Sequence, residues 1–178
     1  ILQDEQGSVL LLEEQDKLEK DKKAFMYGRV VNKHARHNLC FDDLGQEPDY
    51  ENGMGRIIPY SDVPLLDQMR SRLRLYFGNK ANDMKVEGNY YYDVAKCGIG
   101  YHGDSERKRV IGVRLGTTMP LHFQWFHQRK PIGNTIKLSL NDGDMYMMSE
   151  KATGCDWKRT NVSTLRHAAG ASNFLKIP

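Results

Sequence analysis

Residues 98–116 read GIGYHGDSERKRVIGVRLG and place His102 and Asp104 two positions apart, just ahead of an alternating apolar run. In an extended chain, residues i and i+2 project from the same face. An imidazole and a carboxylate on one face can hold the same metal ion, and a second histidine from elsewhere would complete a site of two histidines and one carboxylate. Taken alone, the pair could equally be part of a solvated turn that enters a strand.

Length and composition indicate an ordinary globular domain. The chain has 178 residues, which is enough to bury a core of its own. Hydrophobic residues make up 39% and charged residues 28% of the sequence, and no stretch approaches the roughly 18 consecutive apolar residues that span a bilayer. We therefore expect no membrane insertion. The net charge of +3 permits a nucleic-acid partner without requiring one.

The three cysteines, Cys40, Cys97 and Cys155, are widely spaced and match neither a disulfide framework nor a zinc site. This pattern favours an intracellular, reducing compartment, either cytoplasm or nucleus. The sequence starts without Met and without a signal-peptide pattern, so we expect a trimmed chain in which targeting cannot be read. No pattern in the sequence predicts an oligomeric state.

The N-terminal third combines a predicted helix over residues 8–23 with a predicted strand over residues 24–31. Basic and aromatic side chains follow, among them Arg36 and His37, and they are candidates for a substrate-binding lip. A solvated loop is the alternative for this segment. Residues 42–55 are rich in Asp, Glu, Gly, Asn and Pro and predict a loop.

A second helix is predicted to begin near Pro64, because apolar side chains then recur at intervals of three to four residues until Phe77. Ser61 and Asp62 lie just ahead of it and are candidate N-caps. We expect this helix to pack on a sheet.

The remainder predicts strands. Short apolar or alternating runs are separated by Gly, Pro, Asn and Asp turns, and they cover residues 90–94, 110–115, 121–126, 135–140, 145–148 and 162–168. The pattern indicates an α+β, mainly β fold: a β-sandwich or barrel core with the preceding helices packed on the sheet. We expect one domain over residues 1–178, in which residues 1–60 are an N-terminal extension with the substrate-side segment and residues 61–178 the helix and β core.

Three downstream histidines could supply the second imidazole: His122, His127 and His167. His167 is the strongest candidate, because it lies in a late β segment and is followed by Ala168, Ala169 and Gly170, whose small size allows a cofactor to approach the backbone.

Several of these pieces occur together in the order seen in a known superfamily. They are Asn89-Tyr90-Tyr91, His102-Gly103-Asp104, the strand over residues 110–116 and Gly143-Asp144 before residues 145–148. In this order, over residues 89–170, the chain resembles the Fe(II)/2-oxoglutarate-dependent dioxygenases, most closely the AlkB-like group. The resemblance implies a double-stranded β-helix (jelly roll), the use of Fe(II), 2-oxoglutarate and O₂, and oxidative demethylation or hydroxylation of alkylated nucleic-acid bases, as in DNA repair.

The C-terminal part departs from that group. An AlkB-like distal histidine would be expected near residues 155–158, which contain none, whereas residues 163–169 (STLRHAA) resemble the distal-ligand segment of prolyl hydroxylases. The combined resemblance implies iron ligation by His102, Asp104 and His167. It also implies a cation for the far carboxylate of 2-oxoglutarate, supplied by Lys176 or Arg166, and cosubstrate hydrogen bonds from Asn89 and Tyr91.

The substrate prediction rests on basic and aromatic side chains that suit a flipped base and its phosphates. The candidates are Arg36, His37, Trp125 and His127. Two alternatives stay open: a prolyl-type protein hydroxylase of the same superfamily, and a catalytically silent jelly-roll binding module in which His102 and Asp104 are turn residues only.

Overall fold

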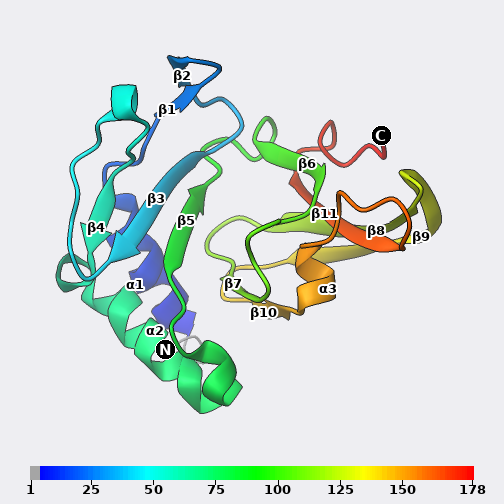
Figure 1. Cartoon of the computed structure of the whole chain (residues 1–178). Coiled ribbons are helices and arrows are strands. Elements are labelled where there is room, and N and C mark those ends of the chain that lie inside the picture. The colour runs from blue at the N-terminus through cyan, green and yellow to red at the C-terminus, as the bar shows by residue number, and fades with distance from the viewer. Residues whose placement is uncertain (1–4) are drawn as a thin grey trace. The chain divides into compact units, whose positions relative to one another are not determined.

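The computed structural model describes residues 5–178 and divides the chain into two compact units, residues 1–92 and 93–178 (Figure 1). Most elements are strands in several sheets, with a few helices, which confirms the α+β prediction. The predicted internal boundary at residues 60/61 differs from the observed division. The reason is that strand β5 (Val86–Tyr90) pairs with β3 (His37–Asp42), so the chain stays in the first unit through Tyr92.

The first unit is built on a three-stranded sheet in the order β4-β3-β5, in which β3 runs parallel to β4 (Ile57–Pro59) and antiparallel to β5. The first unit also contains helices α1 (Glu5–Asp16) and α2 (Pro64–Phe77). It has three short 3₁₀ turns, at Tyr50–Asn52, Tyr60–Asp62 and Gly78–Ala81. The core combines side chains from both helices and the central strand, namely Leu11, Leu39, Phe41, Leu66 and Leu73.

The predicted strand over residues 24–31 is two strands, β1 (Lys23–Met26) and β2 (Arg29–Asn32), which pair as an antiparallel hairpin. The chain turns at Tyr27 and Gly28, whose φ angles are 56° and 75°. Two consecutive left-handed residues give the tight turn that matches the twist of a hairpin. The helix predicted from Pro64 to Phe77 is confirmed.

The N-terminus of α2 is capped from a distance. Val63 occupies the N-cap position and offers no side-chain hydrogen bond, so neither Ser61 nor Asp62 has the predicted role. Instead the Glu14 carboxylate of α1 accepts hydrogen bonds from the backbone N–H groups of Leu65 (2.8 Å) and Leu66 (3.0 Å). A carboxylate at this place also interacts favourably with the helix dipole. Glu14 therefore ties the two helices together.

The second unit contains two antiparallel sheets. The larger has the order β6-β11-β8-β9 and the smaller pairs β10 with β7. The strands are β6 (Gly98–His102), β7 (Val110–Val113), β8 (Met119–His127), β9 (Lys130–Leu140), β10 (Met145–Met148) and β11 (Thr164–Gly170), and a short helix, α3 (Glu150–Thr153), precedes the last. The predicted runs from residue 110 onward are all confirmed as strands; residues 145–148 match β10 at both ends, and the other runs have shifted ends.

The two sheets share one apolar cluster. Leu121 and Phe123 of β8 and Leu165 of β11 are buried with Met148 of β10, and Val110 of β7 packs against them. Because β11 pairs with β8 without a register shift, Leu165 and His167 project to this inner face, and Arg166 projects to the outer face. His167 and Arg166 therefore lie on opposite faces of the larger sheet.

No helix within residues 5–178 is both long and apolar enough to cross a membrane.

The distant cap on α2 gives the first testable prediction. Glu14→Ala removes the acceptor of two backbone hydrogen bonds and should lower the free energy of unfolding by about 1–2 kcal/mol, measured by urea denaturation. Glu13→Ala is the matched control, because Glu13 is exposed on the same helix, and it should stay within about 0.5 kcal/mol of the parent. Equal losses in the two variants would contradict the capping role.

Candidate metal centre

The pairing of β6 with β11 brings two histidines together. In this antiparallel ladder His102 is the direct partner of His167, and their ring centroids lie 4.4 Å apart. Directly opposed residues in a sheet have neighbouring side chains. Two histidines that are 65 positions apart in the sequence are thus held against each other by backbone hydrogen bonding.

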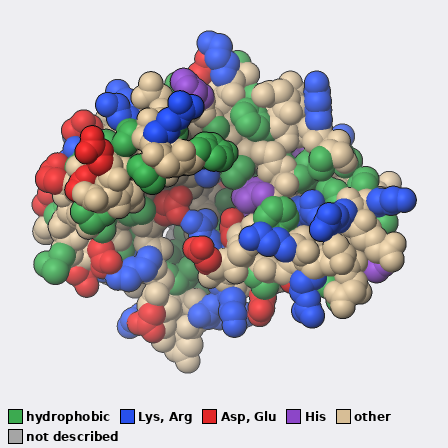
Figure 2. Space-filling model, turned by 45° about the horizontal axis from the view of Figure 1, so that its top comes forward, with side chains coloured by type: hydrophobic (Ala, Val, Ile, Leu, Met, Phe, Trp, Pro, Cys, Tyr) green, Lys and Arg blue, Asp and Glu red, His purple; other side chains and the backbone are tan. Residues whose placement is uncertain are grey.

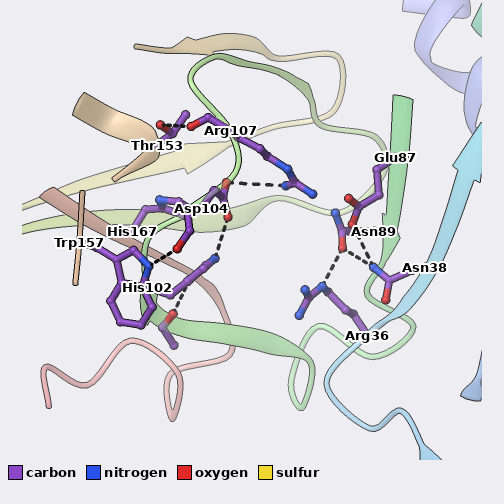
Figure 3. A network of polar contacts seen from close by, with 12 residues as sticks. Arg36, Asn38, Glu87, Asn89, His102, Asp104, Arg107, Thr153, Trp157 and His167 are labelled. Carbon is purple, nitrogen blue, oxygen red and sulfur yellow. Dashed lines mark hydrogen bonds and ion pairs between the residues drawn. The ribbon is translucent and has the colours of Figure 1, made fainter. Parts of the chain in front are cut away.

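Asp104 completes the group. Its Oδ1 lies 3.4 Å from Nε2 of His102, and its Oδ2 lies 3.8 Å from Nε2 of His167. Figure 3 shows the three side chains pointing toward one another. One ligand atom from each residue lies within 4.8 Å of the others, so the group could bind a metal ion. Nitrogen and oxygen ligands lie about 2.1 Å from such an ion, which small side-chain adjustments would achieve here.

The tautomer of His102 suits a metal ligand. Its Nδ1 lies 2.8 Å from the carbonyl oxygen of Gly100. A carbonyl oxygen only accepts hydrogen bonds, so Nδ1 carries a proton, and Nε2 is the ring nitrogen that could bind an ion. Metal-binding histidines are commonly oriented by such a bond from the other ring nitrogen. Nε2 faces Asp104.

The electrostatics of the site keep Asp104 ionised. Burial raises the pKa of Asp104, but the hydrogen bond with His102 and the positive charge of Arg107 lower it by more, so the net pKa lies below the ordinary value. The guanidinium Nη1 of Arg107 is 3.6 Å from Oδ2 of Asp104. The carboxylate is therefore an anion at neutral pH, as metal ligation requires.

His167 is held neutral. Its side chain is buried, with 7% of the residue exposed. Burial first, and the neighbouring His102 second, lower the pKa of His167 to about 4. A buried imidazole avoids the charged form because the protein interior solvates it poorly. At neutral pH the ring thus has a nitrogen lone pair to offer an ion.

Gly103, between the two ligands of the His-x-Asp pair, is required by packing. A Cβ at this position would lie 2.1 Å from the carbonyl oxygen of Gly154 and 2.7 Å from Cβ of Trp157. The indole N–H of Trp157 donates to Ser105 Oγ at 3.0 Å. The segment after α3 therefore rests directly on the backbone that carries His102 and Asp104.

Thr153 anchors the loop on its other side. The backbone N–H of Asp104 donates to the carbonyl of Thr153 at 2.8 Å, and the buried Thr153 hydroxyl donates to the carbonyl of Arg107 at 2.8 Å. Sequence reasoning missed Gly100, Thr153 and Trp157 as supports of the site. Only Gly103 carries a visible signal, because it separates two candidate ligands.

The two cations predicted to bind the cosubstrate differ in position, and Arg166 lies away from the candidate ligands. Arg166 alternates with His167 along β11, so its guanidinium lies on the opposite face of the sheet, over the Phe126 ring at 4.1 Å. Lys176 is exposed in the C-terminal segment. The structure does not bring Arg166 to the candidate metal centre.

The predicted substrate residues are divided between the units. Trp125 and His127 lie on β8 of the second unit, where Trp125 is half-buried and Nδ1 of His127 lies 3.3 Å from Ser163 Oγ. Arg36, His37, Asn89 and Tyr91 belong to the first unit.

In the first unit, the side-chain oxygen of Asn89 accepts hydrogen bonds from Arg36 Nε and Asn38 Nδ2, both at 2.7 Å (Figure 3). That oxygen is thus engaged within its own sheet. The His37 ring stacks on Tyr92 at a centroid distance of 4.5 Å. Burial, and then Lys22, Lys33 and Lys20, lower the pKa of His37. Aromatic rings and cations therefore gather on this unit.

The two units differ in charge. Residues 93–178 contain 13 Lys and Arg against 7 Asp and Glu, a net charge of +6, whereas residues 1–92 contain 13 against 16, a net charge of −3. On the face shown in Figure 2, Lys and Arg side chains (blue) gather at the right, over the strands of the second unit. The unit with the candidate metal centre is thus the basic one.

Comparison with known proteins found a viral relative that is uncharacterized. The chain is 55% identical over 159 residues to an uncharacterized protein of Acanthamoeba polyphaga mimivirus. The match covers 89% of this chain and 62% of the viral protein, so the chain spans less than two thirds of that relative. No family model matches the sequence.

The packing around Gly103 gives a prediction for the site. Gly103→Ala would force apart the backbone at Gly154 and the Trp157 side chain, and should destabilise the protein by about 1–3 kcal/mol while weakening metal binding. Gly100→Ala on the same strand is the control, since the nearest atom to its added Cβ is 3.8 Å away. Thermal unfolding and Co(II) titration measure both effects, and a variant G103A that binds Co(II) like G100A would contradict the packing argument.

The buried neutral His167 predicts a pH dependence for the metal-free protein. As pH falls from about 6.5 toward 4, this residue takes up a proton in the unfolded chain but not in the folded one, so the folded state loses up to about 3 kcal/mol. Asp104 contributes in the same direction only below its ordinary pKa of 3.8.

His167→Gln should therefore flatten the dependence of the unfolding free energy on pH between 4.5 and 6.5, measured by urea denaturation at a series of pH values. His34→Gln, at an exposed histidine, should leave it unchanged. A slope that survives in the H167Q variant would show that His167 is not the titrating group.

Proposed function

We propose that the chain contains the catalytic core of an Fe(II)- and 2-oxoglutarate-dependent dioxygenase with a jelly-roll fold. The observation that carries the proposal is the convergence of His102, Asp104 and His167, with Nε2 of His102 turned toward the carboxylate. Two neutral imidazoles and one carboxylate are the ligand set of the non-heme Fe(II) oxygenases.

The course of the chain through the two sheets supports the jelly-roll part of the proposal. Strands β6, β8, β9 and β11 belong to the larger sheet, and β7 and β10 to the smaller, so the chain passes between the sheets four times. The sheets are joined by a shared apolar cluster. Two antiparallel sheets wound together in this manner are the basis of a jelly roll.

The donor set fits iron in charge as well as in number. Asp104 offers an anionic oxygen, His167 offers a neutral imidazole at pH 7, and His102 directs its Nε2 at the same point. Iron with 2-oxoglutarate would supply the oxidation of a substrate C–H bond by O₂. The protein's own contribution would be to bring the three ligands together beside Phe123, whose ring centroid is 6.1 Å from that of His167.

A dicarboxylate cosubstrate needs a cation for its far end, because burying an unpaired carboxylate costs several kcal/mol. Arg166 faces away from the triad, which leaves Lys176 as the proposed partner among the two residues that the resemblance implies. Its place in the C-terminal segment, after the last strand, leaves it able to approach a bound cosubstrate.

We propose alkylated nucleic-acid bases as the substrate. The net charge of +6 on the second unit favours a polyanion. The stacked pair His37 and Tyr92 with Arg36 nearby in sequence offers flat and cationic groups of the kind that bind unpaired bases and phosphates. Hydroxylation of an N-methyl group, followed by loss of formaldehyde, would restore the base.

A protein hydroxylase is the second candidate. It is favoured by the origin of the third ligand, since His167 lies in the STLRHAA segment that resembles prolyl hydroxylases and not near residues 155–158. The two candidates share the metal centre and differ in the substrate alone.

Metal binding is the first test. The protein should bind Fe(II), and Co(II) as its spectroscopic substitute, at one site, and should release succinate from 2-oxoglutarate in the presence of O₂. His102→Ala and Asp104→Ala should each weaken metal binding by about 100-fold or more and abolish succinate release, because the two ligands that remain bind an ion much more weakly than three.

His122→Ala is the matched control, because His122 lies on the outer face of β8, and it should leave both properties intact. Unchanged metal binding in the H102A and D104A variants would exclude both oxygenase candidates and leave a binding module.

The substrate is tested by stimulation of turnover. An N-methylated single-stranded oligonucleotide should increase succinate release and yield formaldehyde, whereas the unmethylated strand should do neither, because it lacks the C–H bond to be oxidised. Stimulation by a proline-containing peptide, without stimulation by the methylated strand, would select the protein hydroxylase instead.

A further inference from the structure

We propose that the outer face of the larger sheet carries a separate binding site for a phosphate-type oxyanion. Four residues line an open cavity of about 380 Å³ on this face: Arg129, Trp157, Lys158 and Arg166. All four belong to the second unit, and the site does not depend on whether the triad binds iron.

Arg166 is the centre of this site. Its guanidinium carbon lies 4.1 Å from the ring centroid of Phe126 and 5.3 Å from that of Trp157. Among the described residues it donates one long hydrogen bond, 3.5 Å to the Trp157 carbonyl, and pairs with no carboxylate, while its Nε is buried without a partner. A half-buried cation with an unused donor is stabilised by an anion that supplies both charge and acceptor.

Arg129 brings a second cation to the same place at a conformational cost. It lies in the two-residue turn between β8 and β9, where Gln128 and Arg129 have φ angles of 49° and 67°. Such a turn favours Asn-Gly, because residues with a Cβ are strained in the left-handed region. Strain of this kind often marks a functional position.

Arg129 also places a second positive charge beside Arg166 in the cavity. Arg129 is exposed and forms no hydrogen bond or ion pair with any residue of the described chain, yet it lies close enough to Arg166 to lower its pKa, after the larger effect of burial. Two like charges held together without a counter-ion repel each other. An anion between them would remove that repulsion.

The number and type of cations indicate phosphate. Two guanidinium groups and the Lys158 ammonium exceed the single charge of a carboxylate, and guanidinium groups match the tetrahedral oxygens of phosphate with paired hydrogen bonds. The Trp157 ring gives the cavity a flat wall. The phosphate could belong to a small phosphate ester or to the backbone of a nucleic-acid strand, and these two sources can be separated by experiment.

The test uses the fluorescence of Trp157. The chain contains two tryptophans, and Trp125→Phe leaves Trp157 as the reporter. In this background, pyrophosphate and single-stranded oligonucleotides with and without a 5′-phosphate are titrated at 50 and 200 mM salt. We expect saturable binding that weakens with salt.

The decisive variant is Arg129→Gly, which removes the charge and relieves the strained turn, so the protein should be at least as stable as the parent. It should weaken binding about tenfold, as should Arg166→Gln. Arg159→Gln is the matched control, because Arg159 is exposed nearby but does not line the cavity, and it should have no more than a twofold effect.

The two phosphate sources give different outcomes, both of which support the site. Stronger binding of pyrophosphate than of either oligonucleotide identifies a small phosphate ester. Tight oligonucleotide binding that is independent of the 5′-phosphate identifies the strand backbone. The absence of saturable binding by every probe, or equal affinities in the R129G and R159Q variants, would overturn the proposal.

Discussion

The candidate site depends on the antiparallel pairing of β6 with β11. This ladder sets His102 directly opposite His167, and the carboxylate two residues after His102 then reaches both imidazoles. A shift of the register by one residue would turn His167 to the outer face and bring Arg166 or Ala168 opposite His102. The ladder has a register irregularity between His167 and Ala169, and at His167 itself the burial of Leu165 in the inner apolar cluster favours the observed pairing.

The second constraint is the close contact between two loops. Gly103 and Gly154 approach so closely that neither position has room for a side chain, and the Thr153 carbonyl receives the Asp104 N–H. The backbone of Asp104 is thus fixed by a hydrogen bond, and its carboxylate contacts His102 and Arg107. With such preorganisation, the free-energy cost of bringing three polar groups together is met during folding and does not reduce the affinity for an ion.

Local patterns in the sequence predicted the parts of the structure that local physics decides. The three-to-four periodicity after Pro64 identified α2, and turn residues separated the strands of the second unit. Local patterns did not predict contacts between residues far apart in the sequence. Glu14 caps a helix 50 residues away, and β5 pairs with the N-terminal sheet, so the first unit extends to residue 92. For the site, the spacing of His102 and Asp104 was informative, and the late β segment and small neighbours of His167 distinguished it from His122 and His127.

The alternation of side chains along β11 explains why Arg166, which is adjacent to His167 in the sequence, lies away from the candidate metal centre in the structure. Adjacent residues of a strand project to opposite faces, so a cation next to a ligand in the sequence is directed away from the ligand in space. Leu165 and His167 occupy the inner face, where burial keeps the imidazole neutral, and Arg166 occupies the outer face beside Phe126 and Trp157. One strand therefore presents an uncharged ligand to the interior and an unpaired cation to the exterior. The same backbone geometry that directs His167 to the candidate metal centre on one face makes an anion site possible on the other.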